Sequence, residues 1–462
     1  MVTQQKIREI IYERYVSPTV GRRDKSIGIE IEMPIVNLSG EAVEESVSHG
    51  LASAFGKKFG FKVAAVDSDG HCYNMVDPVS GDSLSFDCSY SNLEFSMGKR
   101  KNIFEIKEKF EEYYAYCRKH LKRYGYTVTG MGVNPAYNVN HNYPIPSERY
   151  RMLLHYLKSY RRHIGEGGRH FHKRPDFGTF TSASQVQLDV DAVELLNVLN
   201  VFGKLEPYKI ALFANSLSRE YPDLLCSRNI FWEESMHGYN PRNVGLFGKT
   251  LRSVDELVDY IRGASIYCTE RDGKYYDFTP VPVKDYFNLK EVEGLYFDGK
   301  KYRSGKIVPC LEDIKYLRTF KLEDLTFRGT VEFRSACCQP IHDSMTVAAF
   351  HTGLICKLGE LKELLAKDRV IYGRGLDAFT LLHLFSAKKF PPFTDKEKFR
   401  EQLLRILDLA SLGLASRGYG EEALLAPLYE RAERLSNPAR DLLQGLKEGK
   451  TVRDFIVAYG AL

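Results

Sequence analysis

Four short segments of this chain alternate strictly between apolar and polar side chains, and this alternation constrains the fold more than any other feature. The segments are 27–32 (IGIEIE), 92–96 (NLEFS), 185–189 (QVQLD) and 330–334 (TVEFR). Successive residues of a β-strand point to opposite faces, so each segment has one apolar face and one polar face. The polar faces carry carboxylate, amide and guanidinium groups. The sequence therefore predicts a sheet with one buried face and one unusually charged face.

The polar residues of these segments point to a shared metal site. Carboxylates on one surface repel one another unless cations lie between them, and all-oxygen ligand sets suit Mg²⁺ or Mn²⁺. Any one segment alone is typical of an ordinary amphipathic strand, whereas four such segments favour one common site. The predicted metal ligands are Glu30, Glu32, Glu94, Gln185 and Glu332.

Length and composition narrow the class of protein. The 462 residues carry 65 basic and 60 acidic side chains, a balance that does not favour a nucleic-acid partner. We expect no membrane span, because no apolar run approaches 18 residues, and no secretory signal at the N-terminus. The nine scattered cysteines, none of them in CxxC, indicate reduced thiols and a cytoplasmic protein. A redox pair of Cys72 and Cys88 is the alternative.

The character of the chain changes after Arg334. Strand and helix patterns mix before it, whereas residues 341–462 read as one helix after another. No linker rich in Pro, Gly or Ser separates the two parts. We therefore predict an α+β protein with a catalytic body at 1–340 and a helical region at 341–462 packed on the same unit.

Several large enzyme classes leave no signature in this sequence. The chain contains no GxxxxGK[ST], no GxGxxG after a strand, no HExxH, no zinc-type Cys/His spacing and no GxSxG. What remains is a carboxylate metal site on an antiparallel sheet. A basic, glycine-rich loop at 161–174 is predicted to close over phosphates, with a solvated surface loop as the alternative.

The order of the motifs resembles the glutamate–cysteine ligase family, within the carboxylate–amine ligases of the glutamine synthetase type. Residues 28–32 are similar to its GxExE strand, 92–96 to its second acidic strand and 184–189 to its QVNLD strand. Residues 214–242 resemble its ANS…SR…IW…DPxR block, and 329–334 its closing EFR strand. Three departures stand out: Gln187 replaces an Asn, Asn240 replaces an Asp, and the stretch 167–180 does not match.

The resemblance implies a curved, mainly antiparallel sheet that forms a funnel-shaped active site, with helices packed outside. It implies an ATP-dependent enzyme that joins the γ-carboxylate of glutamate to the amine of cysteine through a γ-glutamyl phosphate, the first step of glutathione synthesis. Mg²⁺ or Mn²⁺ would be required. Glu332 and Arg334 would act in catalysis, with Arg334 facing the transferring phosphate. The residues expected to bind ATP or glutamate are Arg169, Lys173, Gln187, Arg228 and Arg242.

Two other functions are consistent with these residues. One is a γ-glutamyl ligase that uses another amino acid or an amine as the acceptor, because a cysteine pocket leaves no readable motif. The other is a non-catalytic nucleotide or metal-binding protein on the same fold, against which the pairing of Glu332 with Arg334 argues. For the arginines, surface ion pairs are the plain alternative to substrate binding. The sequence predicts no particular oligomeric state.

Overall fold

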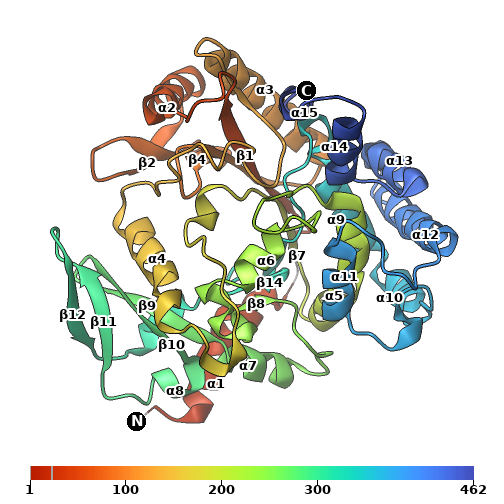
Figure 1. The fold of residues 1–462 in the computed structure, drawn as a ribbon. Coiled ribbons are helices and arrows are strands. Elements are labelled where there is room, and N and C mark those ends of the chain that lie inside the picture. The colour runs from red at the N-terminus through yellow and green to blue at the C-terminus, as the bar shows by residue number, and fades with distance from the viewer. Residues whose placement is uncertain (1, 22–23) are drawn as a thin grey trace.

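A nine-stranded antiparallel sheet carries the four alternating segments. The computed structural model describes residues 2–21 and 24–462, and within them the strand order is β14-β15-β7-β1-β5-β4-β3-β2, with β6 also paired to β1 (Figure 1). The strands are β1 (Ile27–Asn37), β2 (Lys62–Val66), β3 (Cys72–Val76), β4 (Ser83–Phe86), β5 (Asn92–Arg100), β6 (Tyr126–Val128), β7 (Ser184–Asp189), β14 (Glu323–Leu325) and β15 (Thr330–Phe333).

The register of the sheet brings the polar side chains together. Glu30 of β1 lies opposite Gln185 of β7, and Glu32 lies opposite Glu94 of β5. Glu332 of β15 lies opposite Gln187 of β7. Paired residues share a face of a sheet, so all these groups stand on one face, as the alternation predicts.

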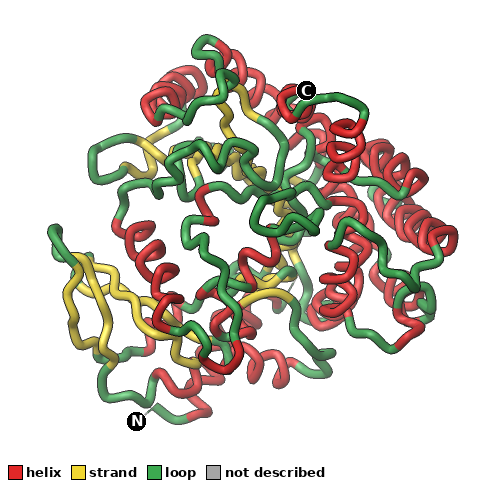
Figure 2. Tube along the Cα trace, viewed as in Figure 1, coloured by secondary structure: helices red, strands yellow, loops and turns green. Residues whose placement is uncertain are grey.

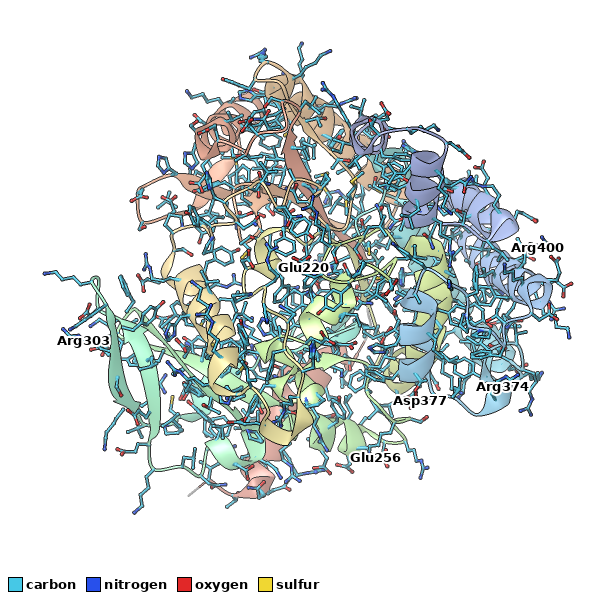
Figure 3. All side chains as sticks on the ribbon, in the orientation of Figure 1. Glu220, Glu256, Arg303, Arg374, Asp377 and Arg400 are labelled. Atoms are coloured by element: carbon cyan, nitrogen blue, oxygen red, sulfur yellow. The ribbon has the colours of Figure 1, made fainter. Side chains whose placement is uncertain are left out.

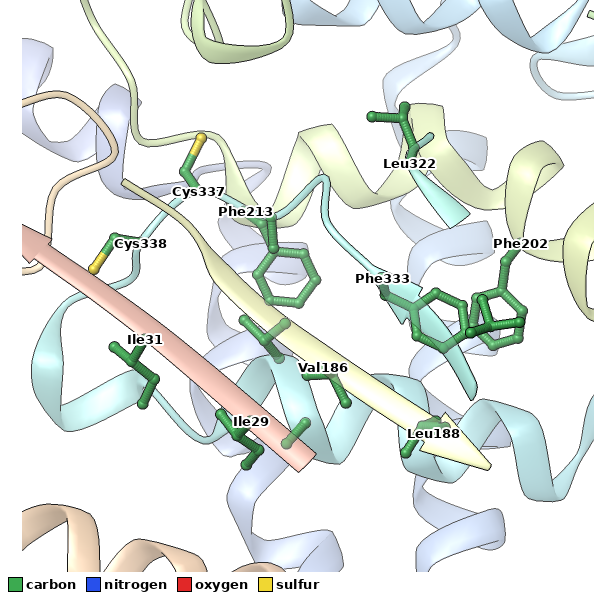
Figure 4. Close-up of a cluster of buried hydrophobic side chains, with 14 of the residues drawn as sticks. Ile29, Ile31, Val186, Leu188, Phe202, Phe213, Leu322, Phe333, Cys337 and Cys338 are labelled. Carbon is green, nitrogen blue, oxygen red and sulfur yellow. The ribbon is translucent and has the colours of Figure 1, made fainter. Parts of the chain in front are cut away.

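The opposite face of the sheet is apolar and packs on helices α5 (Leu195–Phe213) and α9 (Thr346–Cys356). The ring of Phe333 lies 4.6 Å from that of Phe202, centroid to centroid. Figure 4 shows this layer, in which Ile29, Ile31, Val186 and Leu188 project from β1 and β7. Removal of this surface from water stabilises the sheet and fixes which face stays polar.

A second antiparallel sheet, of four strands, lies beside the first, where the sequence indicates only loops and hairpins. Its order is β12-β11-β10-β9, and helix α4 (Glu148–Lys158) contacts β10. The β11-β12 hairpin projects at the left of Figure 1. The strands are β9 (Ser265–Arg271), β10 (Lys274–Pro282), β11 (Val292–Phe297) and β12 (Tyr302–Ile307); the short pair β8 (Val244–Gly245) and β13 (Phe320–Lys321) is parallel.

Helices surround the two sheets and make up the C-terminal third, at the right of Figures 1 and 2. This confirms the predicted α+β class with a helical C-terminal part. In the described part of the chain, no helix is both long and apolar enough to cross a membrane. The remaining α-helices are α1 (Gln4–Ile11), α2 (Glu45–Phe59), α3 (Ile103–Lys122), α6 (Arg228–Glu233), α7 (Val254–Arg262), α8 (Val283–Tyr286), α10 (Leu358–Ala366), α11 (Ala378–Ser386), α12 (Lys396–Ala415), α13 (Ala426–Arg434), α14 (Pro438–Lys447) and α15 (Val452–Tyr459).

One hydrophobic core contains side chains from both sides of residue 340. The rings of Phe213 in α5 and Phe350 in α9 lie 5.4 Å apart within it. Helices α9 and α12 approach closely at Gly353, where a Cβ would lie 2.2 Å from the carbonyl oxygen of Ala410. The division at residue 340 into a catalytic body and a helical region stays a prediction.

Candidate active site

Two amides tie the carboxylates of β1 to strand β7. Gln185 Nε2 donates to Glu32 Oε1 over 2.9 Å and to Glu30 Oε2 over 3.4 Å. Gln187 Nε2 donates to Glu30 Oε1 over 2.8 Å. The backbone N–H of Ala183 donates to the second oxygen of Glu32 over 2.7 Å. The two glutamates are thus held in defined orientations on the polar face.

A carboxylate that we did not predict, that of Asp87, also joins this cluster. Glu32, Asp87 and Glu94 each offer one oxygen, and these oxygens lie within 4.8 Å of one another. Asp87 directly follows β4 and lies near helix α4, because Tyr150 donates to its Oδ1 over 3.2 Å. The polar residues Ser83, Ser85 and Asp87 alternate with Leu84 and Phe86. The same period of two that marks the other strands could therefore have identified Asp87.

Crowding and burial change the acidity of these groups. Burial raises the pKa of Glu30, Glu32 and Glu94 to about 8 in each case. Neighbouring negative charge adds to the effect, chiefly from Glu332 on Glu30 and from Asp87 on Glu32 and Glu94. Carboxylates with such pKa values are poorly compensated by protein groups, as expected of a surface that holds cations.

Arg334 supplies positive charge beside the cluster. Its Nη1 donates to Glu332 Oε1 over 2.6 Å, and Arg228 Nη1 donates to the carbonyl oxygen of Arg334 over 2.8 Å. Asp324 of β14 pairs with Glu332 across the sheet, and burial raises its pKa to about 6 although Arg334 opposes the rise. Two carboxylates, of Asp324 and Glu332, and two guanidinium groups, of Arg228 and Arg334, are therefore gathered at this side of the polar face.

Two cavities open on this polar face. The first, of about 340 Å³, is lined by Glu32, Asp87, Glu332 and Arg334 among others. The second, of about 550 Å³, is lined by Glu30, Ser96 and Gln187 among others, and Arg328 lines both. Of the carboxylates described above, Glu32, Asp87 and Glu332 line the first cavity and Glu30 lines the second.

The first cavity is also lined by basic and aromatic residues from outside the nine-stranded sheet. Arg149 of α4 and Arg318 have exposed side chains that line it, and the buried Arg228 of α6 lines it as well. Tyr150, Trp232, Tyr267 and Phe320 supply the aromatic surface. Arginine forks suit carboxylate and phosphate groups. The cavity thus has two kinds of lining. We call its carboxylates the acidic floor and its arginines, which suit anions, the basic wall.

Some predicted binding residues lie elsewhere. Arg169 and Arg242 line a separate cavity of about 650 Å³, together with Lys249. Arg242 donates to the carbonyl oxygens of Asp259 and Tyr260 at the end of α7. Lys173 is exposed and is not among the residues that line the first cavity. The roles assigned to these three residues in ATP or glutamate binding stay predictions, and their positions favour the surface alternative.

The donor set of the carboxylate cluster fits a hard divalent cation. Every candidate ligand supplies oxygen, from Glu30, Glu32, Asp87, Glu94 or Glu332. In addition, Gln185 Oε1 is buried and has no hydrogen-bond partner among the described residues. A buried acceptor without a donor is costly, and a cation would satisfy it. Charged groups remote from this face, such as Arg303, Arg374 and Arg400, project at the periphery (Figure 3).

Comparison with known proteins assigns the chain to a family. The sequence model of Glutamate-cysteine ligase family 2 (GCS2) matches residues 26–358. The chain belongs to this family. The matched range contains all four alternating strands and nearly every residue that lines the first cavity. The resemblance inferred from the motif order is therefore confirmed.

Two curated relatives and one solved structure are similar to this chain at low sequence identity. The chloroplastic glutamate–cysteine ligase of Brassica juncea is 25% identical over 69% of this chain, and that of Nicotiana tabacum is 24% identical over 71%. The chain spans 58% of the length of each. The solved structure is a glutamate–cysteine ligase from Francisella tularensis in complex with AMP. The match covers 96% of this chain and 88% of the Francisella chain, with 11% sequence identity and a TM-score of 0.49.

The two single-residue departures from the family motifs have defined contacts. Gln187 uses its extra reach to bridge strands, because its Oε1 accepts from Arg328 Nη2 over 2.8 Å while its amide binds Glu30. Asn240 Nδ2 donates to the carbonyl oxygen of Gly263 over 2.8 Å and to Ser265 Oγ over 2.7 Å. Gln187 therefore belongs to the polar face, whereas Asn240 fastens the end of α7 to β9.

Proposed function

We propose that this protein is an ATP-dependent ligase that joins the γ-carboxylate of glutamate to the amine of cysteine through a γ-glutamyl phosphate. The observation that carries the proposal is the set of four glutamates and Arg334 on one sheet face, in a chain of the glutamate–cysteine ligase family. Phosphoryl transfer depends mainly on positioning and charge neutralisation. An acidic floor that faces a basic wall suits that chemistry.

We assign metal binding to Glu30, Glu32, Glu94, Gln185 and Glu332, and we add Asp87 to this set. When Mg²⁺ or Mn²⁺ is bound there, it neutralises negative charge on the transferring phosphoryl group. Gln185 and Gln187 orient Glu30 and Glu32 through the hydrogen bonds of their amides. Such support keeps acidic groups in place when substrates exchange.

The proposed reaction has two steps. First, an oxygen of the γ-carboxylate of glutamate bonds to the terminal phosphorus of ATP, and the bond from this phosphorus to the bridging oxygen breaks, which releases ADP. Second, the amine nitrogen of cysteine bonds to the acyl carbon, the bond from this carbon to the phosphate oxygen breaks, and the nitrogen gives up a proton. We assign Arg334 to the negative charge that develops on the phosphate oxygens, since preorganised donors act most strongly there.

The basic wall of the first cavity suits the carboxylates of the substrates. Arg149, Arg228 and Arg318 line it, and a guanidinium binds a carboxylate through two parallel hydrogen bonds. The side chain of Arg228 is partly committed, because its Nη1 holds the carbonyl oxygen of Arg334. Arg149 and Arg318 are therefore our first choices for binding the α-carboxylate of glutamate.

A panel of acceptors tests this function. Release of phosphate from ATP would be measured with glutamate and each of the twenty amino acids, with Mg²⁺ and after chelation, and the products would be identified by mass. We expect glutamate, cysteine and Mg²⁺ together to give γ-glutamylcysteine, and Glu94→Gln to give none. A different preferred acceptor would support the second ligase function. If no acceptor gave phosphate release, the remaining function would be that of a non-catalytic nucleotide or metal-binding protein.

A further inference from the structure

A second group of metal-binding side chains lies outside the active-site cavities. His49 of helix α2, and Asp67 and His71 of the turn between β2 and β3, each offer one ligand atom within 4.8 Å of the others. Glu45 lies one helical turn before His49, on the same face of α2. None of these residues takes part in the proposed ligase reaction. We call them the His49–His71 cluster.

Hydrogen bonds hold the carboxylate of this cluster in place. Asp67 Oδ1 accepts from the backbone N–H groups of Asp69 and His71, over 2.9 and 2.8 Å. Its Oδ2 accepts from the hydroxyl of Tyr90 over 2.7 Å and lies 3.5 Å from His71 Nδ1. Asp67 is only 6% exposed, yet one of its oxygens faces an imidazole nitrogen. Metal ligands are commonly oriented by such supporting groups.

The half-buried imidazole of His49 has one buried nitrogen without a hydrogen-bond partner in the described part of the chain. His49 Nε2 is buried and makes no hydrogen bond among the described residues. Its ring meets that of Tyr90 edge-on, with centroids 4.3 Å apart, and stacks on that of His71 with centroids 3.8 Å apart. An imidazole nitrogen that makes no hydrogen bond can offer its lone pair to a metal ion.

We propose that His49, Asp67 and His71 bind a transition-metal ion of the Zn²⁺ type, with Glu45 as a further oxygen donor. Two imidazoles and a carboxylate are a ligand set for Zn²⁺ and not for Mg²⁺. Stacked rings cannot both aim nitrogen lone pairs at one ion, so one ring must turn. His71 is the ring that turns, because its side chain is 46% exposed at a hairpin turn, whereas Tyr90 confines His49.

Ion binding here would join three separate parts of the chain. The ligands come from α2 and from the β2-β3 hairpin, which lies at the edge of the large sheet. Tyr90, which binds Asp67, lies three residues after Asp87 in the connection from β4 to β5. An ion that binds only the folded chain stabilises it. The same ion would also stabilise the loop that holds Asp87 in the active-site cavity.

Equilibrium dialysis with Zn²⁺ tests the cluster. The protein is first stripped with chelator and then kept in excess Mg²⁺, so that the carboxylate cluster is not the measured site. We expect the wild type to bind one Zn²⁺, and His71→Ala to bind it more weakly by roughly tenfold or more, as even the loss of a supporting group does at metal sites. His170→Ala, another exposed histidine that lies outside the cluster, should bind as the wild type does.

The nine free cysteines are competing ligands for soft metal ions. A second measurement, with Co²⁺, therefore identifies the atoms that bind the ion. The Co²⁺ protein should absorb as a nitrogen and oxygen complex, and the visible bands should change in His71→Ala and not in His170→Ala. Equal Zn²⁺ affinity of the wild type and His71→Ala would overturn the proposal. Absence of Zn²⁺ binding, or a Co²⁺–thiolate band that accounts for the bound ion, would overturn it as well.

Discussion

The guanidinium of Arg334 donates from Nη1 to Oε1 of Glu332, two residues earlier in the chain, over 2.6 Å. Both residues line the first cavity. The surrounding carboxylates raise the pKa of Arg334 even though burial opposes this, and Glu332 contributes most to the rise. Arg334 therefore keeps its positive charge beside the carboxylates of this face.

Replacing Arg334 by Lys should lower kcat far more than it raises KM for ATP or glutamate. Lysine keeps the charge but loses the planar fork, and a preorganised donor acts mainly on charge that develops in the transition state. We expect a loss in kcat on the order of a hundredfold or more. Steady-state kinetics would be compared with Arg303→Lys, whose guanidinium pairs with Asp298 at the periphery. A raised KM with unchanged kcat would place Arg334 in simple binding.

Glu30→Gln and Glu94→Gln should each abolish ligation and leave the metal-free fold intact. Burial raises the pKa of both carboxyl groups to about 8, so the neutral, near-isosteric glutamine resembles the form that the metal-free protein favours. Thermal melts in chelator should match the wild type, as should those of the exposed control Glu363→Gln. Melting temperatures many degrees lower in both active-site variants would show that the two residues are structural.

The strands and the charged face could be predicted from the sequence because a period of two is a local property. Asp87 continues such a period, so the same reasoning could have predicted it. Arg149 and Arg318 could not be predicted in this way. They lie outside the four alternating segments, and only the packing of the folded chain brings them to the cavity. Arg242 has a family-like motif around it, but its contacts with the end of α7 became visible only in the structure.

The buried Lys321 should make stability depend on pH. Its Nζ donates to the carbonyl oxygens of Val244 and Leu246 and to the hydroxyl of Tyr260, and burial lowers its pKa to about 7. The unfolded chain binds this proton up to a higher pH, so above pH 7 the unfolded state holds more protons and stability rises with pH.

The measurement is the free energy of unfolding of the wild type and of Lys321→Met between pH 7 and pH 9. The wild type should gain roughly 1.4 kcal/mol per pH unit relative to the variant. Other titrating groups are common to both proteins and cancel in the difference. Parallel pH profiles would mean that the folded protein keeps Lys321 charged, with its three acceptors compensating for burial.

Gly353→Ala should destabilise the protein by about 1–3 kcal/mol or more, because the new Cβ would collide with α12. The nearest atom, the carbonyl oxygen of Ala410, would lie 2.2 Å away. Gly359→Ala in α10 is the matched control, since beyond the adjoining backbone of its own helix no described atom lies within 4 Å of its Cβ position. It should stabilise the helix by about 0.5 kcal/mol. Denaturant unfolding measures the free energy of unfolding of both variants. Equal stability of the two variants would contradict the close packing of α9 on α12.

Oxygen-isotope transfer tests the proposed reaction most directly. Glutamate labelled with ¹⁸O in its γ-carboxylate would be converted with ATP, cysteine and Mg²⁺, and the released phosphate would be analysed by mass spectrometry. If the γ-carboxylate attacks the terminal phosphorus of ATP, each phosphate carries one labelled oxygen, because the carbon–oxygen bond breaks in the second step. Label found in AMP, or product formed with unlabelled phosphate, would contradict a γ-glutamyl phosphate and with it the function proposed for this site.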